Sequence, residues 1–372
     1  MFLITRIPRY RRSLSAIGIL SAFAFSLWFV PLGLAAQTET TASQEEPPAN
    51  SDPDAGQLIQ RAYKISKTAA NRADFTQTIQ LCDQAMEKKT TPAQLKYLRQ
   101  LKSWSLVERA RLHTGIEPTD ALHKSMEDCL LATRLDADNW KAHVWLAKQK
   151  VSLGKTGEAI LNLDAAIRKN PSDGNLWFNR AELFFAGGEF EVAITDYTQA
   201  LKLNKTDVQA LTGRAHSYVR LAQHERALLD YNAVVERAGR NAVSFLNRAE
   251  LHLRMKNFKS AGEDYREALT RNQKLPAAYR GVAWMYATSG SDDYYNPTVA
   301  DRAIKRAIEL DGQETAENLV VLAASQAAGG EYRMARDTLK RVKAVKNLDT
   351  DCLDRIRFLE TRKWFLAGTG KN

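Results

Sequence analysis

Residues 174–207 read GNLWFNRAELFFAGGEFEVAITDYTQALKLNKTD, and the 34 residues that follow repeat the same order of small, aromatic and charged positions. Ala193 within this stretch is one of four alanines spaced 34 residues apart, with Ala159 before it and Ala227 and Ala261 after it. A sequence period of 34 is typical of helix–turn–helix repeats. The stretch therefore predicts an array of helical hairpins.

Four units in this register cover residues 140–275. They begin at Trp140, Gly174, Val208 and Ala242, and numbering each unit from its first residue gives comparable columns. Positions 8, 20 and 27 carry small residues, mostly alanine, and larger residues stand at positions 4, 11 and 24. Two antiparallel helices approach closely only where both carry small residues, and the larger ones fill the remaining space. These columns therefore predict the core.

The pattern extends outward with less regular spacing. Residues 58–139 predict two divergent hairpins, the second with a long first helix from about residue 93 to residue 113. Residues 276–346 predict two variant hairpins with a loop of extra residues at 289–299, and residues 347–372 predict a capping helix and tail. A repeat stack needs such a cap. The sequence thus predicts an all-α, right-handed superhelical solenoid of about eight hairpins.

On these residues the chain resembles the tetratricopeptide repeat family, closely over 140–275 and loosely over 59–139 and 276–346. The run FNRAELFFAGGEFEVAITDYTQALKLN at 178–204 resembles the form common in exported bacterial members of that family. The resemblance implies scaffolding and the capture of peptides or proteins. It implies no chemical reaction.

The N-terminus carries an export signal. Residues 1–12 hold four arginines and no acid, and residues 13–36 carry no charge at all. This order is typical of a secretory signal peptide at 1–35, with the mature chain beginning at Ala36. The uncharged run is also long enough to serve as an uncleaved membrane anchor. The acidic, proline-rich residues 36–57 predict a flexible linker. We expect the chain in the periplasm or cell envelope, or anchored in the inner membrane.

Charge and cysteine content exclude two classes of protein. The net charge of +10 falls to +6 once the four leader arginines are removed, and the chain has no nucleic-acid-binding motif. Three cysteines are too few for a disulfide scaffold. Cys82 and Cys129 both fall at position 24, a core column, which predicts buried thiols, while the redox state of Cys352 stays open.

Arginine recurs at position 7, and aspartate at position 23, of three successive units. The pairs are Arg180 with Asp196, Arg214 with Asp230, and Arg248 with Asp264. In the preceding unit, where position 7 is Leu146, position 23 is Asn162 instead of an acid. A half-buried charge without its partner is costly, so this joint occurrence predicts ion pairs that connect the two helices of a hairpin.

The outward columns of the first helices form a surface that a ligand could follow, here called the first-helix face. The candidate contact residues on it are Phe178, Glu182, Phe185, His216, Arg220, Leu246, Glu250, Arg254, Arg280 and Trp284. Large apolar residues beside arginines predict a partner-binding groove with a basic rim. The alternative is that the apolar members pack between adjacent hairpins, and the sequence leaves both interpretations open.

No motif for catalysis is present. The six histidines form no HExxH, and the sequence has no CxxC, no GxSxG and no glycine-rich phosphate loop after a strand. A metal held by His113, His123 and Asp120 would have to span a predicted loop. We therefore predict no enzyme activity, no cofactor and no metal site.

The sequence favours a non-enzymatic scaffold of the bacterial cell envelope that binds a peptide or helix of a partner protein along the first-helix face. Two alternatives are a binder of anionic cell-wall polymer, which would use the positive excess, and an accessory subunit of an envelope enzyme complex. Polymer binding should weaken steeply with salt, whereas an apolar groove should tolerate it. The partner and the oligomeric state do not follow from the sequence.

Overall fold

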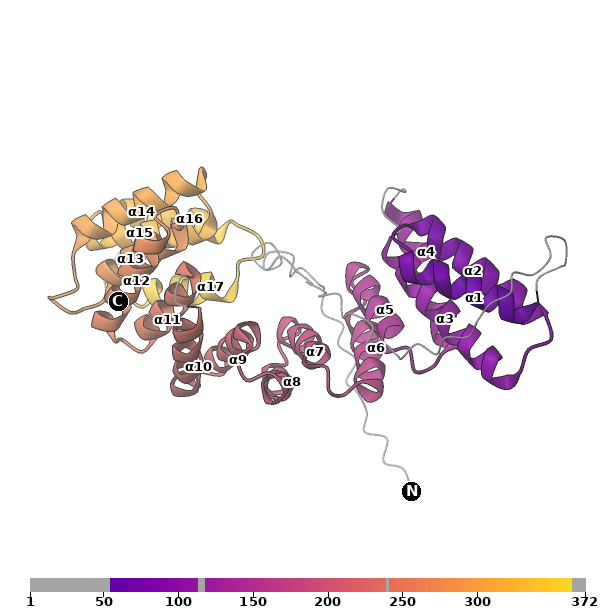
Figure 1. Cartoon of the computed structure of the whole chain (residues 1–372). Coiled ribbons are helices and arrows are strands. Elements are labelled where there is room, and N and C mark those ends of the chain that lie inside the picture. Colours follow the sequence, from indigo (N-terminus) through magenta and orange to yellow (C-terminus); the bar gives the residue numbers. More distant parts are fainter. Residues whose placement is uncertain (1–53, 113–117, 239–240, 363–372) are drawn as a thin grey trace, which may run out of the picture. The chain divides into compact units, whose positions relative to one another are not determined.

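The computed structural model describes residues 54–112, 118–238 and 241–362, and within them the chain forms seventeen α-helices and no strand (Figure 1). The first sixteen helices pair in order into eight hairpins, which confirms the predicted all-α solenoid. Within these ranges no helix is both long and apolar enough to span a bilayer. The expected signal peptide or anchor lies outside the described residues, as do residues 36–53 of the linker predicted at 36–57. The linker prediction extends too far, because Asp54 caps α1 and residues 55–57 form its first turn.

The described residues fall into two compact units. The N-terminal unit runs from Asp54 to Arg237 and the C-terminal unit from Ala238 to Arg362. The N-terminal unit contains α1 (Ala55–Thr68), α2 (Arg72–Glu87), α3 (Pro92–Arg111), α4 (Pro118–Leu135), α5 (Trp140–Ser152), α6 (Thr156–Lys169), α7 (Gly174–Ala186), α8 (Phe190–Leu203), α9 (Val208–Arg220) and α10 (His224–Arg237). The long helix α3 matches the prediction of 93–113 to within two residues.

The C-terminal unit contains three hairpins and a final helix. Its helices are α11 (Ala242–Arg254), α12 (Phe258–Arg271), α13 (Pro276–Thr288), α14 (Pro297–Asp311), α15 (Ala316–Ala328), α16 (Tyr332–Lys343) and α17 (Thr350–Glu360). The extra residues expected at 289–299 form the connection between α13 and α14. In both units the odd-numbered helix of each hairpin comes first.

The first helices of the regular repeats begin where the register places them, because an acidic or amide side chain caps each one. Asp173 accepts a hydrogen bond from the backbone N–H two residues ahead at 3.0 Å, and Asp207 and Asn241 do the same at 2.9 Å. Such caps satisfy a backbone donor that the helix itself leaves unpaired. Position 1 of each unit is therefore the first helical residue.

The predicted small-residue columns form the core. Ala159, Ala193, Ala227 and Ala261 are all fully buried, which confirms the register. Tyr197 and Tyr265 at position 24 are also buried and fill the space between neighbouring hairpins. Because each hairpin packs only on its neighbours, the core is a series of small clusters along the array.

All three cysteines are buried free thiols. Burial raises the pKa of Cys82, Cys129 and Cys352 to about 12. These thiols are therefore protonated at neutral pH, and the prediction that Cys82 and Cys129 act as small apolar core residues is confirmed.

Every turn between the helices of a hairpin from α5 to α16 has one residue in the left-handed region. Glycine provides it in four hairpins, at Gly154, Gly188, Gly290 and Gly330. In the other two the residue is Ala222, with φ of 54°, and Lys256, with φ of 60°. A residue with a Cβ pays a steric cost of about 1 kcal/mol in this conformation. Two turns thus hold local strain that glycine relieves elsewhere.

We predict that Lys256→Gly raises the free energy of unfolding by about 0.5 to 1 kcal/mol, because glycine adopts the left-handed conformation without that cost. Chemical denaturation measures the change. The matched control is Lys64→Gly at an exposed position inside α1, which should destabilise by about 1 kcal/mol. Destabilisation by both substitutions would contradict the assigned strain.

Candidate functional site

The three predicted Arg–Asp pairs are present, and each joins the two helices of one hairpin. The Arg180 Nε and Nη2 atoms both lie 2.7 Å from the Asp196 carboxylate oxygens. The pairs Arg214–Asp230 and Arg248–Asp264 have the same two-point geometry at 2.7 and 2.8 Å. The aspartates are buried, so the guanidinium groups satisfy charges that would otherwise be costly. These residues build the scaffold.

A fourth Arg–Asp pair was not predicted from the sequence. Arg109 in α3 donates to Asp128 in α4 at 2.6 and 2.9 Å. The partners are 19 residues apart instead of 16 because six residues separate α3 from α4, whereas three separate α7 from α8. The available signal was Asp128 itself, which directly precedes Cys129 and so stands at position 23.

We predict that Arg214→Ala and Asp230→Ala each lower the free energy of unfolding by about 2 to 3 kcal/mol, because each leaves a half-buried charge unpaired. The double variant should cost clearly less than the sum of the two, since the residues interact directly. Thermal or urea unfolding measures all three. Arg226→Ala, at an exposed position of α10, is the control and should have an effect below about 0.5 kcal/mol. Strictly additive losses would contradict the pairing.

Two glutamates predicted to line the groove are bonded to core tyrosines instead. The Tyr265 hydroxyl donates to Glu250 at 2.9 Å, and the Tyr197 hydroxyl donates to Glu182. Burial raises the pKa of Glu182. The ring of Tyr197 lies against Gly213 in the next hairpin, where an added Cβ would come within 2.4 Å of the ring. The glutamate at position 9 therefore holds the tyrosine whose ring packs against the next hairpin.

His216 occupies the same position 9 in the repeat between them. Its ring packs edge-on against Tyr231, with centroids 5.8 Å apart, and lies 6.4 Å from the ring of Phe185. Burial lowers the pKa of His216 to about 4. The imidazole is therefore neutral at neutral pH and packs as an aromatic ring between Phe185 and Tyr231.

This burial makes stability depend on pH in a defined window. Above pH 6.5 His216 is neutral in both folded and unfolded chains, so it contributes no pH dependence. As the pH falls from 6.5 towards 4, the unfolded chain binds a proton that the folded chain resists, and stability falls. The stability of the His216→Phe variant relative to the parent should therefore rise by roughly 2 kcal/mol between pH 7 and pH 4.5. Urea unfolding at both pH values measures this difference, and a constant difference would contradict it.

The remaining groove candidates of the N-terminal unit are half-buried aromatics beside an arginine. Phe178 lies 5.9 Å from the ring of Tyr197, and Phe185 lies 5.4 Å from that of Phe190. The Arg220 guanidinium stands 5.0 Å over the Phe190 ring. These side chains therefore pack between hairpins and are also partly exposed, and their role in partner binding stays a prediction.

Three groove predictions in the C-terminal unit need correction. Leu246 is buried, so its side chain belongs to the core and offers no contact surface. Arg280 pairs with Asp311 at 2.7 Å and donates to Asn318 at 3.3 Å, which ties α13 to α14 and α15. Arg254 pairs with Asp351 of α17. Neither Arg280 nor Arg254 is a free rim charge.

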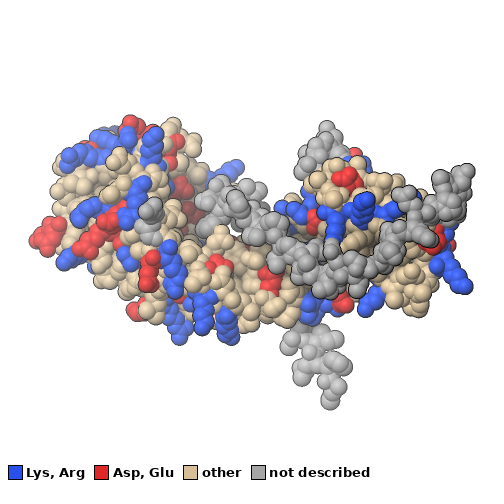
Figure 2. Space-filling view, viewed as in Figure 1, with Lys and Arg blue, Asp and Glu red and all other residues tan. Residues whose placement is uncertain are grey.

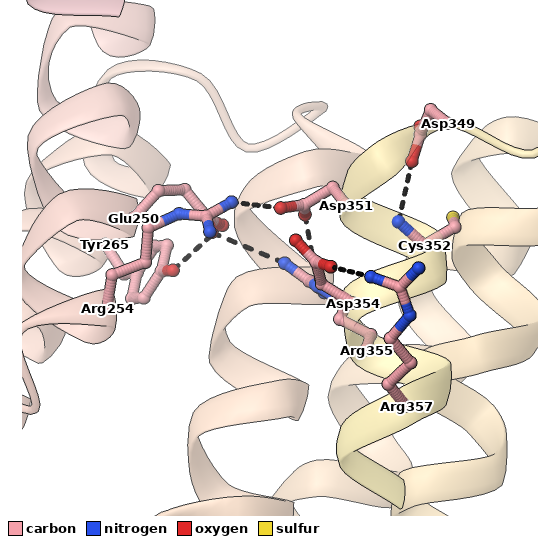
Figure 3. Close-up of polar contacts among 9 residues, drawn as sticks. All are labelled: Glu250, Arg254, Tyr265, Asp349, Asp351, Cys352, Asp354, Arg355 and Arg357. Carbon is pink, nitrogen blue, oxygen red and sulfur yellow. Dashed lines mark hydrogen bonds and ion pairs between the residues drawn. The ribbon is translucent and has the colours of Figure 1, made fainter. Parts of the chain in front are cut away.

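The final helix, α17, lies on the first-helix face of the C-terminal unit (Figure 3). Its Arg355 reaches Glu250 of α11 at 3.4 Å and stands 4.9 Å over the ring of Trp284 in α13. Phe358 packs on the same indole, with centroids 5.6 Å apart. α17 thus does more than cap the last hairpin, because Glu250, Arg254 and Trp284 all contact it.

Comparison with known protein families identifies the repeats. Residues 146–208 and 212–290 match the sequence profile of the family Tetratricopeptide repeat. These residues carry tetratricopeptide repeats. Such repeats generally serve as non-enzymatic scaffolds for protein–protein interaction, with an extended surface that contacts the partner. None of the curated proteins compared matches the chain.

Several solved tetratricopeptide structures are similar to it. PilW, a widely conserved type IV pilus biogenesis factor, aligns with a TM-score of 0.49 at 15% identity, over 61% of this chain and 99% of PilW. YrrB, a protein with an unusual peptide-binding site, aligns with a TM-score of 0.42 at 19% identity, over 47% of this chain and 89% of YrrB. A tetratricopeptide repeat protein from Parabacteroides merdae aligns with a TM-score of 0.41 at 15% identity, over 82% and 97%. At these identities the likeness concerns the fold alone.

Among the described residues, one group near the repeats could offer ligands to a metal. Glu317, Asp349 and Cys352 have ligand atoms within 4.8 Å of one another. Asp349 already accepts a hydrogen bond from the backbone N–H of Cys352 at 2.6 Å, which caps α17. The raised pKa of Cys352 keeps its sulfur protonated. The geometry is that of a helix cap.

The other metal site considered from the sequence would use His113, His123 and Asp120. His113 lies outside the described residues, so the structure does not define this group.

Proposed function

We propose that this protein is a non-enzymatic scaffold of the bacterial cell envelope that binds a peptide or helix of a partner protein on its first-helix faces. One observation carries the proposal: the first-helix face of the C-terminal unit already holds a helix, α17, through Glu250, Arg254 and Trp284. A surface that binds one helix through charge and aromatic contacts has the chemistry to bind another. The proposed location rests on the signal peptide, or uncleaved anchor, predicted at residues 1–35.

The N-terminal unit offers a second surface of the same kind. Phe178 and Phe185 supply aromatic area that is already held in place by Tyr197 and Phe190. Exposed Arg220 adds a positive charge beside them. Aromatic anchors in fixed positions bind partners at low entropic cost, and arginine is enriched at such contacts. This face fits an extended or helical segment that carries apolar residues and an acid.

The surface charge favours a protein partner over an anionic polymer. Lys and Arg side chains are interspersed with Asp and Glu over both units on the face shown in Figure 2. Binding a polyanion requires a concentration of positive charge that raises the local potential. Interspersed charges suit the matched polar rim of a protein interface instead.

Photo-crosslinking in intact cells, followed by envelope fractionation, tests the proposal. A photoreactive residue at Gln209, exposed at position 2 of α9, should capture a discrete protein in the envelope fraction. The control position is Leu229 on the second helix α10, whose side chain is 70% exposed. It should capture little. Equal capture from both positions would contradict binding on the first-helix face.

Two further measurements separate the alternatives. Arg220→Glu should weaken capture from Gln209 at least several-fold, because it places a like charge against an acidic partner, whereas Arg226→Glu on α10 should not. Raising the salt concentration to about 0.5 M should reduce capture only moderately. Loss of all binding at that salt, together with retention on cell-wall polymer, would favour the polymer binder.

A further inference from the structure

We propose that α17 is an internal ligand of the C-terminal unit, and that the physiological partner of this face is a helix with the same residue spacing that displaces it. This rests on the function proposed above and names the partner class for one of its surfaces. Helix α17 contacts α11, α13 and α15, the first helices of three successive hairpins, in addition to the ion pair between its Glu360 and Lys343 of α16. A stacking cap would contact the last hairpin alone.

One stripe of α17 makes the polar and aromatic contacts. Asp351, Arg355 and Phe358 are spaced at i, i+4 and i+7, so they share one side of the helix. Asp351 pairs with Arg254 and also lies 3.3 Å from Arg355. Arg355 is thereby held between two carboxylates, those of Asp351 and Glu250. Figure 3 shows these contacts converging between α11 and α17.

A neighbouring stripe of α17 is apolar and buried. Cys352, Ile356 and Leu359, also spaced at i, i+4 and i+7, belong to the same buried cluster as Leu319 of α15. The third side holds Leu353, Asp354 and Arg357, which are exposed, and Arg357 pairs with Asp354 on the helix surface. α17 is therefore enclosed on two sides, as a helix seated in a groove would be. A competing helix needs acid, arginine and phenylalanine on one stripe and small or branched apolar residues on the next.

The attachment of α17 is of a kind that a partner can overcome. Helix α17 has eleven residues, too few to be stable on its own, so its helical state depends on the groove. Arg254 and Asp351 are each about two-fifths exposed, and ion pairs at such sites contribute little. Residues 344–349 connect it to α16 without regular structure. A short connection gives α17 a local concentration of about 1 mM, so an external helix displaces it when its affinity exceeds that of α17 by more than the ratio of that local concentration to its own concentration.

A binding assay on the full chain tests the proposal. The probe is a fluorescent peptide of residues 348–362. The opened variant carries Asp351→Ala, Arg355→Ala and Phe358→Ala, which remove the polar and aromatic groove contacts of α17 and leave its apolar stripe in place. It should bind the peptide at least 10-fold more tightly than the parent, because binding to the parent requires displacement of α17. The matched control, Leu353→Ala with Asp354→Ala and Arg357→Ala, alters the exposed side of the same helix and should behave as the parent.

Charge reversal identifies the contact surface. In the opened variant, Arg254→Glu should weaken binding of the peptide several-fold, and a peptide with Asp351→Lys should restore it. Glu250→Gln should also weaken binding, because it removes the charge that faces Arg355 while it keeps an acceptor for Tyr265. Equal binding of the peptide to parent and opened chains, or no binding to an opened chain of unchanged helicity, would overturn the proposal.

Hydrogen exchange on the parent gives a result that does not depend on the variants folding. Amides of α17 should exchange at least 10-fold faster than those of α15, because α17 detaches while the hairpins stay folded. Equal protection of the two helices would make α17 a fixed part of the fold and would overturn the proposal. Capture from Gln209 in the N-terminal unit does not involve α17, so it tests the scaffold function separately.

Discussion

Close contact between paired helices at buried alanines is the constraint on which the structure depends. Because Ala193, Ala227 and Ala261 have no side chain beyond Cβ, the two helices of each hairpin lie near enough for longer residues to reach across. Arg214 then meets Asp230, and Tyr265 meets Glu250. The polar pairs are therefore consequences of the spacing, and they in turn fix the rotation of each helix. Together these contacts decide which side chains face outward.

The sequence predicts the contacts whose residues recur with the 34-residue period, and few others. Arginine and aspartate at fixed columns predict their own pairing, because three copies occur in one chain. The columns predict a groove position for Glu182 and His216. A position within the repeat indicates the direction in which a side chain points, but it does not show which tyrosine lies beside that side chain. The placement of α17 could not be predicted at all. Asp351 lies 97 residues from Arg254, and no repeated column connects positions so far apart.

The first-helix face differs between the two units. In the N-terminal unit Phe178 and Phe185 pack on neighbouring aromatic rings and still reach the surface. In the C-terminal unit the column of Phe178 holds Leu246, which is buried, and the column of Arg220 holds Arg254, which is paired with α17. One architecture thus offers an accessible surface and an occupied one. A scaffold with both can bind one partner constitutively and a second only on competition.

The contact between Tyr197 and Gly213 limits how such an array can change by recombination. The ring fills the space that a side chain at position 6 of the next unit would need, and the same relation holds between Tyr265 and Gly281. A unit with asparagine at position 6, such as the one that contains Asn247, cannot follow Tyr197 without rearrangement. These repeats are therefore not interchangeable modules. Replacing the unit that contains Gly213 or Gly281 by one with a side chain at position 6 would require the preceding tyrosine ring to move.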